Sequence, residues 1–372
     1  MDITFVSFDE VPSFKGATTH ILSGLRIPSQ KHRVRLISLG SLALRPSTGI
    51  LHYPINITER NTLKRGFLFR ERVQSVLRQH KADLVHFRTP WEGLPIVRRG
   101  ISCIFEVNGL PSVELPYHFS ALSTTALDTF RSWEEECLAG ASHIICPSAQ
   151  IEQFIREHYR VCRGKLISVF RNAYDPLPLP FAARTTCSKR AVYIGTLSSW
   201  QGIVWALGAF RELQGSWTLD VFSPYSKLLW KRFQHRVRRL GLGESVHLYE
   251  PIHRAALLEK LPCYDAGLAP LVRTERNNLQ GCYPLKLLEY LAHGLPVIAS
   301  DLPVNRQVII HEVNGLIHEA NSILSLVACL ERIKNEPDLL ASLRAGSIPS
   351  LKTQWTWQEY GQRLCELYER FA

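Results

Sequence analysis

Residues 284–300 read PLKLLEYLAHGLPVIAS, a pattern typical of a helix that runs directly into a buried strand. Pro284 suits the first position of a helix, and Gly294 suits the left-handed residue that follows the last turn. Residues 296–299 are apolar and form the strand that follows at once. The stretch therefore predicts one helix–strand unit of a parallel sheet.

The same alternation extends along the chain in both directions. Short apolar runs are followed by longer helical stretches, which is the pattern of βαβ units. The strands predicted in the first half are 3–8, 34–39, 84–87, 103–107, 143–146 and 166–170, and those in the second half are 191–194, 218–222, 246–248, 266–269, 297–299 and 315–317. The expected fold class is α/β, with parallel sheets covered by helices.

The chain length predicts more than one domain. A chain of 372 residues exceeds what one core usually covers, so two domains are expected. Prolines at alternate positions from 176 to 180 forbid a helix or a central strand, which predicts a linker over residues 176–189. We expect an N-terminal domain over 1–175 and a C-terminal domain over 190–354. Residues 355–372 carry an amphipathic aromatic stripe and are expected to form a helix that packs back onto the N-terminal domain.

Composition excludes several classes of protein. With 45% hydrophobic and 21% charged residues the chain resembles soluble globular proteins, which excludes a mainly disordered, collagen-like or coiled-coil protein. The sequence contains neither a signal peptide nor an apolar window long enough to span a membrane, so a cytoplasmic location is expected. The nine cysteines are scattered without a CxxC pair, which argues against a disulfide framework and a structural zinc site.

The charge balance points to anionic partners. The formal net charge is +11, and basic residues concentrate in segments 60–99 and 227–239. Both segments are consistent with solvated helix faces. Because segment 60–99 belongs to the predicted N-terminal domain, a second hypothesis is peripheral association with an anionic membrane at its cytoplasmic face. No nucleic-acid-binding module is recognisable, so no nucleic acid partner is expected.

The helix predicted at the start of residues 284–300, before Gly294, has one polar face. Lys286, Glu289 and His293 share this face at spacings of three and four residues. The helix start, from Tyr283 to Lys286, offers unpaired backbone N–H groups and the positive end of the helix dipole, which suits a diphosphate. Glu289, one turn further on, suits the vicinal hydroxyls of a ribose. The alternative is an exposed ion pair between Lys286 and Glu289 that binds nothing.

Residues 284–300 also resemble the donor-binding motif of retaining glycosyltransferases of family 4. That family has the GT-B architecture, in which two Rossmann-like doubly wound parallel-sheet domains face a cleft. Other segments follow in the family's order and cover most of the chain. Residues 11–20 resemble its N-terminal glycine-containing loop, 106–109 its acceptor-side loop, 146–148 its serine element, 172–175 its hinge motif, 194–202 the first loop of its donor domain and 264–270 a late strand.

The resemblance implies an enzyme that moves a sugar from a nucleoside-diphosphate sugar to a hydroxyl acceptor with retention of configuration. The acceptor would be a glycan, a lipid-linked glycan or a small molecule. Asn108 and Glu106 are the catalytic candidates and would shape the sugar and acceptor pocket, and Glu106 is also a candidate base. The residues predicted to bind the donor are Gly16, Thr196, Ser198, Gln201, Arg273, Arg276, Tyr283, Pro284, Leu285, Lys286 and Glu289.

Departures from the family's motifs leave alternatives open. The family has two glutamates eight residues apart, and Glu289 matches the second, whereas Gly281 occupies the first position. A family histidine at the acceptor-side loop is replaced by Asn108. A GT-B-fold nucleotide-sugar isomerase and a degenerate, non-catalytic scaffold are therefore kept as alternatives.

The family's two phosphate-binding cations are also missing. Their positions hold Thr196 and Gln201. Arg273 and Arg276 follow the strand of residues 266–269 and are expected to replace the charge, because ligands of open α/β sheets lie beyond the carboxyl ends of the strands. No metal is expected, since no aspartate has another two residues away to form an Asp-x-Asp pair. No cofactor besides the nucleotide sugar is expected.

Overall fold

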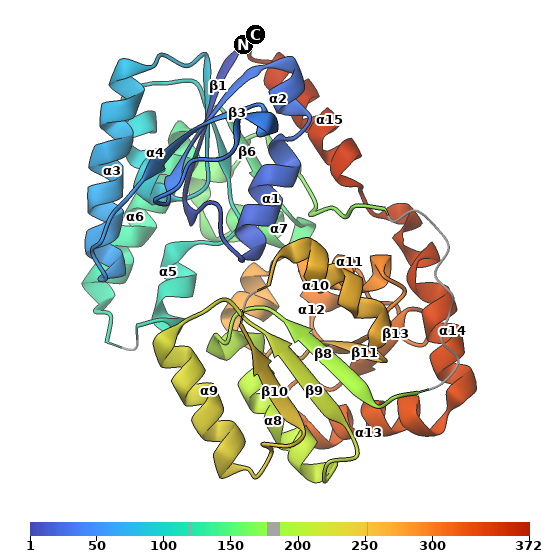
Figure 1. Cartoon of the computed structure of the whole chain (residues 1–372). Helices are drawn as coiled ribbons and strands as arrows, with labels where there is room; N and C mark the ends of the chain where they lie inside the picture. The colour runs from blue at the N-terminus through green and yellow to red at the C-terminus, as the bar shows by residue number, and fades with distance from the viewer. Residues whose placement is uncertain (120, 177–186, 251) are drawn as a thin grey trace. The chain divides into compact units, whose positions relative to one another are not determined.

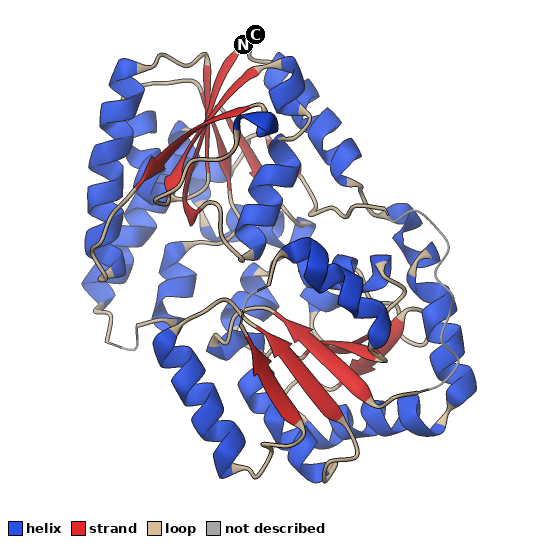
Figure 2. Ribbon diagram, in the orientation of Figure 1, coloured by secondary structure: helices blue, strands red, loops and turns tan. Residues whose placement is uncertain are grey.

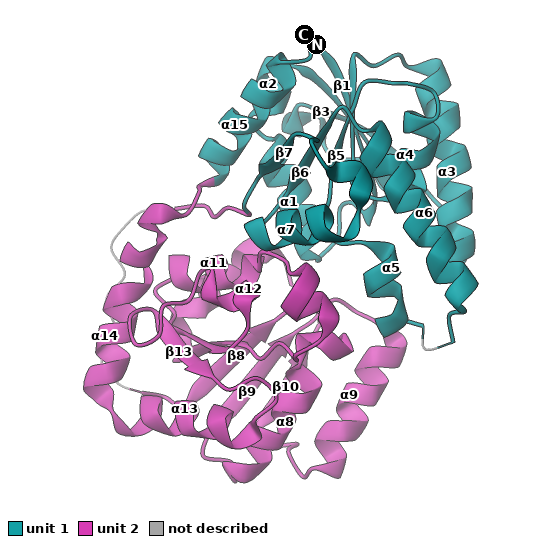
Figure 3. Cartoon of the chain, turned by 180° about the vertical axis from the view of Figure 1, so that it is seen from behind, with its two compact units in different colours: residues 1–171, 357–372 teal, residues 172–356 magenta. Residues whose placement is uncertain are grey.

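The computed structural model describes residues 1–119, 121–176, 187–250 and 252–372. The chain divides into two compact units, shown in Figure 3: unit 1 comprises residues 1–171 and 357–372, and unit 2 comprises residues 172–356. Each unit contains its own parallel sheet with helices packed against it, as Figure 2 shows. The predicted α/β class with two Rossmann-like parallel-sheet domains is confirmed.

Unit 1 has a seven-stranded sheet in the order β3-β2-β1-β4-β5-β6-β7 (Figure 1). The order reverses between β1 and β4, and doubly wound sheets bind ligands at the carboxyl ends of the strands beside such a reversal. The strands are β1 (Asp2–Glu10), β2 (Arg33–Leu39), β3 (Ile50–Ile55), β4 (Leu84–Phe87), β5 (Cys103–Glu106), β6 (His143–Cys146) and β7 (Ile167–Val169). The helices are α1 (Gly16–Leu25), α2 (Pro28–Lys31), α3 (Thr62–Gln79), α4 (Pro90–Val97), α5 (Pro111–Glu114), α6 (Thr124–Gly140), α7 (Ala149–His158) and α15 (Trp357–Glu369).

Strand β3 was not predicted from the sequence. It contains Pro54, which pairs with Ser38 of β2. Proline cannot donate to a ladder of backbone hydrogen bonds and is confined to edge strands, and β3 is the edge of this sheet. The strands that were predicted in both halves of the chain are confirmed to within two residues at either end.

The last helix, α15, belongs to unit 1 and contacts α1 and α2. The helices approach closely because glycines leave room for larger neighbours. A Cβ atom on Gly24 would lie 2.9 Å from the ring of Tyr360, and one on Gly361 would lie 2.7 Å from Ile27. Trp357, at the start of α15, is fully buried.

The stretch that enters unit 2 lies beside the stretch that leaves it. Tyr174 donates its N–H to the carbonyl oxygen of Trp355 at 3.1 Å, and Tyr174 and Thr356 form a parallel bridge. Most of the predicted linker, residues 177–186, lies outside the described residues.

Unit 2 has a six-stranded sheet in the order β10-β9-β8-β11-β12-β13, which reverses between β8 and β11. Consecutive residues of β8 point into different core clusters, Val192 into one and Tyr193 into the other, as the pleat of a doubly covered sheet requires. The strands are β8 (Arg190–Ile194), β9 (Thr218–Phe222), β10 (Val246–Tyr249), β11 (Ala266–Ala269), β12 (Val297–Ser300) and β13 (Gly315–His318). The helices are α8 (Ile203–Glu212), α9 (Lys227–Arg239), α10 (Arg254–Lys260), α11 (Leu285–Ala292), α12 (Pro303–Arg306), α13 (Ile323–Asn335) and α14 (Pro337–Ser347).

Candidate functional site

Helix α11 carries the pattern from which the donor site was predicted. It begins at Leu285, one residue later than predicted, because the backbone of Pro284 is extended with φ −70° and ψ 110°. Gly294 has a φ of +65°, so the predicted left-handed residue after the helix is confirmed. On the predicted polar face, Glu289 and His293 are only 8% and 6% exposed. A charged carboxylate this deeply buried requires a partner.

Lys286 lies against the loop that follows β8. Its Nζ donates a hydrogen bond to Gln201 Oε1 at 2.8 Å and lies 4.2 Å from the centre of the Tyr193 ring. A Cβ atom on Gly195 would lie 2.9 Å from this Nζ and 2.8 Å from the Tyr193 hydroxyl, so glycine makes room for the ammonium group. Burial lowers the pKa of Lys286 to about 7.

Two hydroxyl side chains complete the loop after β8. Thr196 Oγ1 lies 3.1 Å from Ser198 Oγ, and the Tyr193 hydroxyl donates to the Thr196 carbonyl oxygen at 2.6 Å. The structure therefore brings together Thr196, Ser198, Gln201 and Lys286. They stand beside the reversal of strand order between β8 and β11, where a ligand of such a sheet is expected.

Glu289 is paired with an arginine that the sequence analysis missed. Its Oε1 accepts a hydrogen bond from Nε of Arg254, the first residue of α10, at 2.9 Å. Arg254 Nη1 also lies 3.9 Å from Asp175 Oδ2. Burial raises the pKa of Glu289, and the Arg254 charge opposes that rise. Arg254 lies 35 positions before Glu289 and outside the quoted motifs, so no local signal identified it.

The two arginines predicted to replace the missing cations lie in different surroundings. The Arg276 guanidinium lies 5.4 Å from the centre of the Trp200 ring, beside the loop after β8. Arg273 is exposed, and its backbone N–H donates to Asn321 Oδ1 at 3.0 Å. Within the part of the chain that the structure describes, no hydrogen bond or ion pair joins Arg273 to the side chains of Lys286 and Glu289.

The residues at the start of α11 differ in exposure. Tyr283 is buried, and its hydroxyl donates to the Gln354 side chain, so the ring packs in the core. Its carbonyl oxygen accepts a hydrogen bond from Asn172 Nδ2 at 2.6 Å. Pro284 and Leu285 are half-buried. Any contact of Tyr283 with a donor would therefore use its backbone.

Gly281 occupies the position at which the family that this motif resembles has its first glutamate. It follows a π-helical turn (Arg276–Gln280), and its φ of +83° and ψ of −175° lie in a region that is essentially restricted to glycine. A side chain at this position would be strained by the backbone conformation itself. The backbone conformation at position 281 therefore requires glycine, in addition to the absence of the family's carboxylate there.

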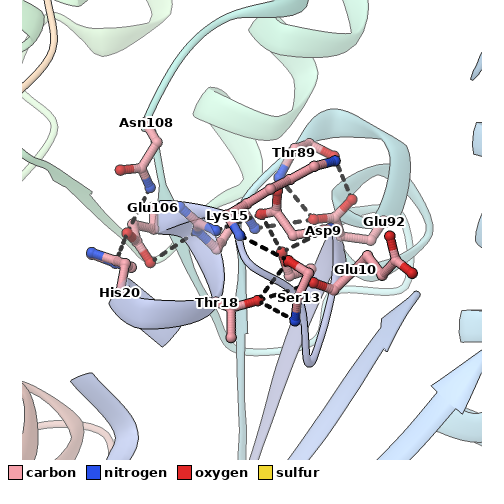
Figure 4. Close-up of polar contacts among 12 residues, drawn as sticks. Asp9, Glu10, Ser13, Lys15, Thr18, His20, Thr89, Glu92, Glu106 and Asn108 are labelled. Carbon is pink, nitrogen blue, oxygen red and sulfur yellow. Dashed lines mark hydrogen bonds and ion pairs between the residues drawn. The ribbon is translucent and has the colours of Figure 1, made fainter. Parts of the chain in front are cut away.

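In unit 1, Glu106 stands at the carboxyl end of β5 and is 3% exposed. Its Oε1 accepts a hydrogen bond from Asn108 Nδ2 at 2.6 Å and lies 2.6 Å from His20 Nε2 (Figure 4). Its Oε2 lies 3.2 Å from His86 Nε2 and 3.5 Å from Arg88 Nε. The two predicted catalytic candidates, Glu106 and Asn108, are thus in direct contact.

The electrostatics of this cluster favour an ionised carboxylate. Burial alone would raise the pKa of Glu106, but His20 and Arg88 hold it well below its usual range. Arg88 also pairs with Asp9, with Nη1 and Oδ2 2.5 Å apart. A carboxylate held so strongly ionised is a poor proton acceptor. The geometry therefore favours Glu106 as a group that orients Asn108 and His20.

Helix α15 adds two hydroxyl groups to the Glu106 cluster. The Tyr368 hydroxyl lies 2.7 Å from His86 Nδ1, and the Tyr360 hydroxyl lies 3.5 Å from His20 Nε2. Burial lowers the pKa of His86. The aromatic stripe of this helix was interpreted as packing alone. No local pattern could link His86 to Tyr368, which follows 282 positions later.

A polar hollow of about 310 Å³ opens at the carboxyl ends of β1, β2 and β3. Asp9, Glu10, Lys15, Asn56 and Arg65 are among the residues that line it. Gly16, predicted to bind the donor, follows Lys15 as the exposed first residue of α1. The mixed charges of the hollow suit a polar ligand.

The basic segment 60–99 does not form one surface. Arg88 is buried in the Glu106 cluster. Arg70 lies 4.6 Å from the centre of the Trp133 ring and donates to the Trp91 carbonyl oxygen at 3.2 Å. These two arginines therefore support the fold and add little to an exposed cationic face.

The described residues contain neither a metal-binding cluster nor a helix that could span a membrane. Within the ranges that the structure describes, no group of three or more His, Cys, Asp or Glu side chains is arranged to hold a metal ion. No helix in the same ranges combines the length and the apolar character needed to cross a membrane.

Solved structures share this fold over the whole chain. A sucrose-phosphate synthase from Thermosynechococcus elongatus has a TM-score of 0.80 and 15% identity, with 100% of this chain and 99% of that chain covered. Anabaena HepE in complex with UDP and glucose has a TM-score of 0.76 and 17% identity, with 99% of each chain covered. At these identities the likeness establishes the fold, which is that of GT-B glycosyltransferases.

Family models match both halves of the chain. Residues 15–176 match the model described as Glycosyltransferase Family 4, and residues 188–336 match the model described as Glycosyl transferases group 1. Together the two models cover most of the sequence, so the chain is a GT-B glycosyltransferase by class. Its N-terminal part matches a Glycosyltransferase Family 4 domain and its C-terminal part a Glycosyl transferases group 1 domain.

A curated relative matches part of the chain. D-inositol 3-phosphate glycosyltransferase from Thermobispora bispora is 28% identical over 129 residues, which is 35% of this chain and 28% of the relative. The matched segment thus spans less than a third of that relative's length.

Proposed function

We propose that this protein transfers a sugar from a nucleoside-diphosphate sugar to a hydroxyl group of an acceptor, with retention of anomeric configuration. The observation that carries the proposal is the pair of polar side chains on α11. Lys286 faces the hydroxyl-rich loop after β8, and Glu289 stands three residues further on with a carboxylate that is only partly engaged. A solved structure that shares this fold was determined in complex with UDP and glucose, which supports a nucleotide sugar as the class of donor.

The donor diphosphate brings about two negative charges that need compensation. Lys286 and the start of α11 supply positive charge on the same side of the loop after β8. Arg276, over Trp200 of that loop, is the next cation. In this proposal Arg276 is better placed than Arg273, and phosphate neutralisation needs no metal ion.

The proposed reaction keeps the attacking and leaving oxygens on one face of the sugar. The bond between the anomeric carbon and the diphosphate oxygen breaks, and its electron pair stays with the diphosphate. The acceptor oxygen forms the new bond to the anomeric carbon, and its proton passes to an oxygen of the departing phosphate. Lys286 stabilises the charge that develops there. In unit 1, Glu106 orients Asn108, to which we assign a role in acceptor binding.

A lipid-linked glycan at the cytoplasmic face of a membrane is the acceptor class we propose. Helix α3 exposes Lys64, Leu68 and Arg72 at spacings of four residues, and Phe67 is 47% exposed beside them. Cations next to apolar side chains suit an anionic lipid surface. The fraction of protein that sediments with phosphatidylglycerol vesicles should fall when Lys64 and Arg72 are both replaced by Gln. Equal binding of the unmodified protein to phosphatidylcholine vesicles would contradict an anionic lipid surface.

Thermal unfolding with UDP, GDP, ADP and their glucose or mannose esters, each with and without EDTA, tests the donor site. A ligand at 100 times its dissociation constant stabilises by about 2.7 kcal/mol. A shift with one nucleotide that survives EDTA is expected. No shift with any nucleotide would favour a non-catalytic scaffold. Conversion of the nucleotide sugar without an acceptor would instead identify an isomerase.

A further inference from the structure

Arg254 is the one side chain within hydrogen-bond distance of the Glu289 carboxylate among the described residues. The bond joins Arg254 Nε to Oε1 alone, and no described residue donates to Oε2. The Glu289 side chain is 10% exposed and the Arg254 side chain 33%. One carboxylate oxygen is thus fixed by the protein, and the other keeps its full capacity to accept hydrogen bonds.

We propose that Arg254 is a positioning residue that holds Glu289 so that its Oε2 accepts hydrogen bonds from the ribose hydroxyls of the donor nucleotide. This inference rests on the proposed function, because it requires a nucleotide at α11. It makes recognition of the ribose depend on a residue of α10, outside the helix that carries the carboxylate.

The guanidinium group is suited to this task because it is held from two sides. Its Nε contacts Glu289, and its Nη1 lies 3.9 Å from the carboxylate of Asp175. A planar guanidinium that hydrogen-bonds one carboxylate and is attracted by a second has a fixed direction for its hydrogen bond to Glu289, which a flexible ammonium does not. A Lys at position 254 would therefore keep the charge and lose part of the orientation.

The charged groups around Glu289 also show that Arg254 favours the ionised form of this carboxyl group. Burial raises the pKa of Glu289, Arg254 and Lys286 lower it, and Asp175 raises it. His293 contacts the backbone carbonyl oxygen of Glu289, 2.7 Å from its Nδ1. Without Arg254 the carboxyl group would hold its proton to a higher pH and would offer one fewer acceptor.

Isothermal titration calorimetry with UDP, GDP and ADP and with their 2′-deoxy forms tests the proposal. The readout is the ratio of the dissociation constants for the deoxy and ribose forms of the nucleotide that binds. In the unmodified protein the ribose form should bind about tenfold more tightly, the scale of one hydrogen bond to a charged group. Arg254→Gln and Glu289→Gln should each bring the ratio close to one, and the double variant should change it no further.

Two further variants separate positioning from general damage. Arg254→Lys should restore part of the ratio. Arg190→Gln breaks a comparable pair in the same unit, in which Arg190 Nη2 lies 2.9 Å from Asp220 Oδ2 with side-chain exposures of 43% and 5%. This control should leave the ratio unchanged. In Arg254→Gln the lost preference for ribose should return in part as the pH is raised, because the Glu289 carboxyl then ionises again.

Several results would overturn the inference. If Arg254→Gln binds nucleotide with an unchanged ratio, or weakens both forms equally, Arg254 acts on the phosphates or on folding. If Arg254→Gln does not fold, the single variants Arg254→Lys and Glu289→Gln provide the test. An unchanged ratio of dissociation constants in both of them contradicts the inference. Equal binding of both forms by the unmodified protein refutes the ribose contact and leaves the donor site intact. Failure of all the nucleotides to bind refutes the proposed function as well.

Discussion

Glu106 of unit 1 and Glu289 of unit 2 are both buried carboxylates, yet their surroundings differ. Glu106 lies within 3.5 Å of Asn108, His20, His86 and Arg88, so protein side chains surround both of its oxygens, and the buried Oε2 faces His86 and Arg88 without a hydrogen bond among the described residues. Glu289 has a single hydrogen bond of this kind in the described structure. The first carboxylate is thus enclosed by protein groups, whereas the second has one oxygen without a donor in the part of the chain described and has capacity left for a ligand.

The largest effect is expected at the enclosed carboxylate. Glu106→Gln removes the buried charge that faces Arg88, His20 and His86 and leaves Asp9 as the carboxylate beside Arg88, which should cost about 3–5 kcal/mol of folding free energy. Urea denaturation measures this loss. Arg98→Ala, which removes an exposed pair with Glu136, should cost less than about 1 kcal/mol. Equal losses in the two variants would show that Glu106 is not a structural hub.

Substitution of Glu289, whose Oε2 has no donor among the described residues, should instead affect nucleotide binding. Glu289→Ala should weaken nucleotide binding by about 1.5–3 kcal/mol, the contribution of hydrogen bonds to a charged group. Circular dichroism should show little change in the fold. Calorimetric titration with the nucleotide that stabilises the protein provides the measurement, and unaltered affinity would refute the assignment of Glu289 to the ribose.

The neighbouring ammonium group should make binding depend on pH. Since the pKa of Lys286 is about 7 in the unliganded protein, its charged fraction falls as the pH rises. Affinity for a nucleotide sugar should therefore drop about tenfold between pH 6 and pH 8. Titrations with the sugar ester avoid the terminal phosphate that ionises in this range. Lys286→Arg should bind with little pH dependence, because arginine stays charged; a flat profile in the unmodified protein would contradict the phosphate role.

The smallest effect is expected at the edge of the Glu106 cluster. Tyr368→Phe removes a hydroxyl that lies 2.7 Å from buried His86 Nδ1, which should cost about 1 kcal/mol of stability. Tyr360→Phe is the matched control, because its hydroxyl is 3.5 Å from His20 and should contribute less. Neither variant should alter nucleotide binding in unit 2. Weaker nucleotide binding in Tyr368→Phe would contradict the assignment of a structural role to Glu106 and a binding role to Glu289.

The sheets and α11 could be predicted from sequence because their signals are local. Apolar runs mark the buried strands, and proline and glycine mark the ends of the helix. Strand β3 was missed because Pro54 argues against a strand unless the edge position is known. The polar face of α11 was expected from spacing, but its burial depends on α10, which covers Glu289 with Arg254.

The candidate site was predicted only where a motif carried it. Glu106 and Asn108 lie two residues apart, so one loop identified both. The partners of Glu106 come from α1 and from the end of β4, while α15 contacts two of these partners, and only folding brings them together. The basic segment 60–99 shows the opposite error, since sequence proximity grouped arginines that the fold sends to different places.

The membership of α15 in unit 1 has a consequence for synthesis. A ribosome makes the chain in order, at about 5–20 residues per second, so residues 357–372 follow residue 171 by roughly 10–40 s. During that interval the nascent first unit lacks the helix that packs on Gly24 and Ile27 and supplies Tyr368 to His86. The unit that emerges first is therefore finished last, after the whole of the second unit has been translated.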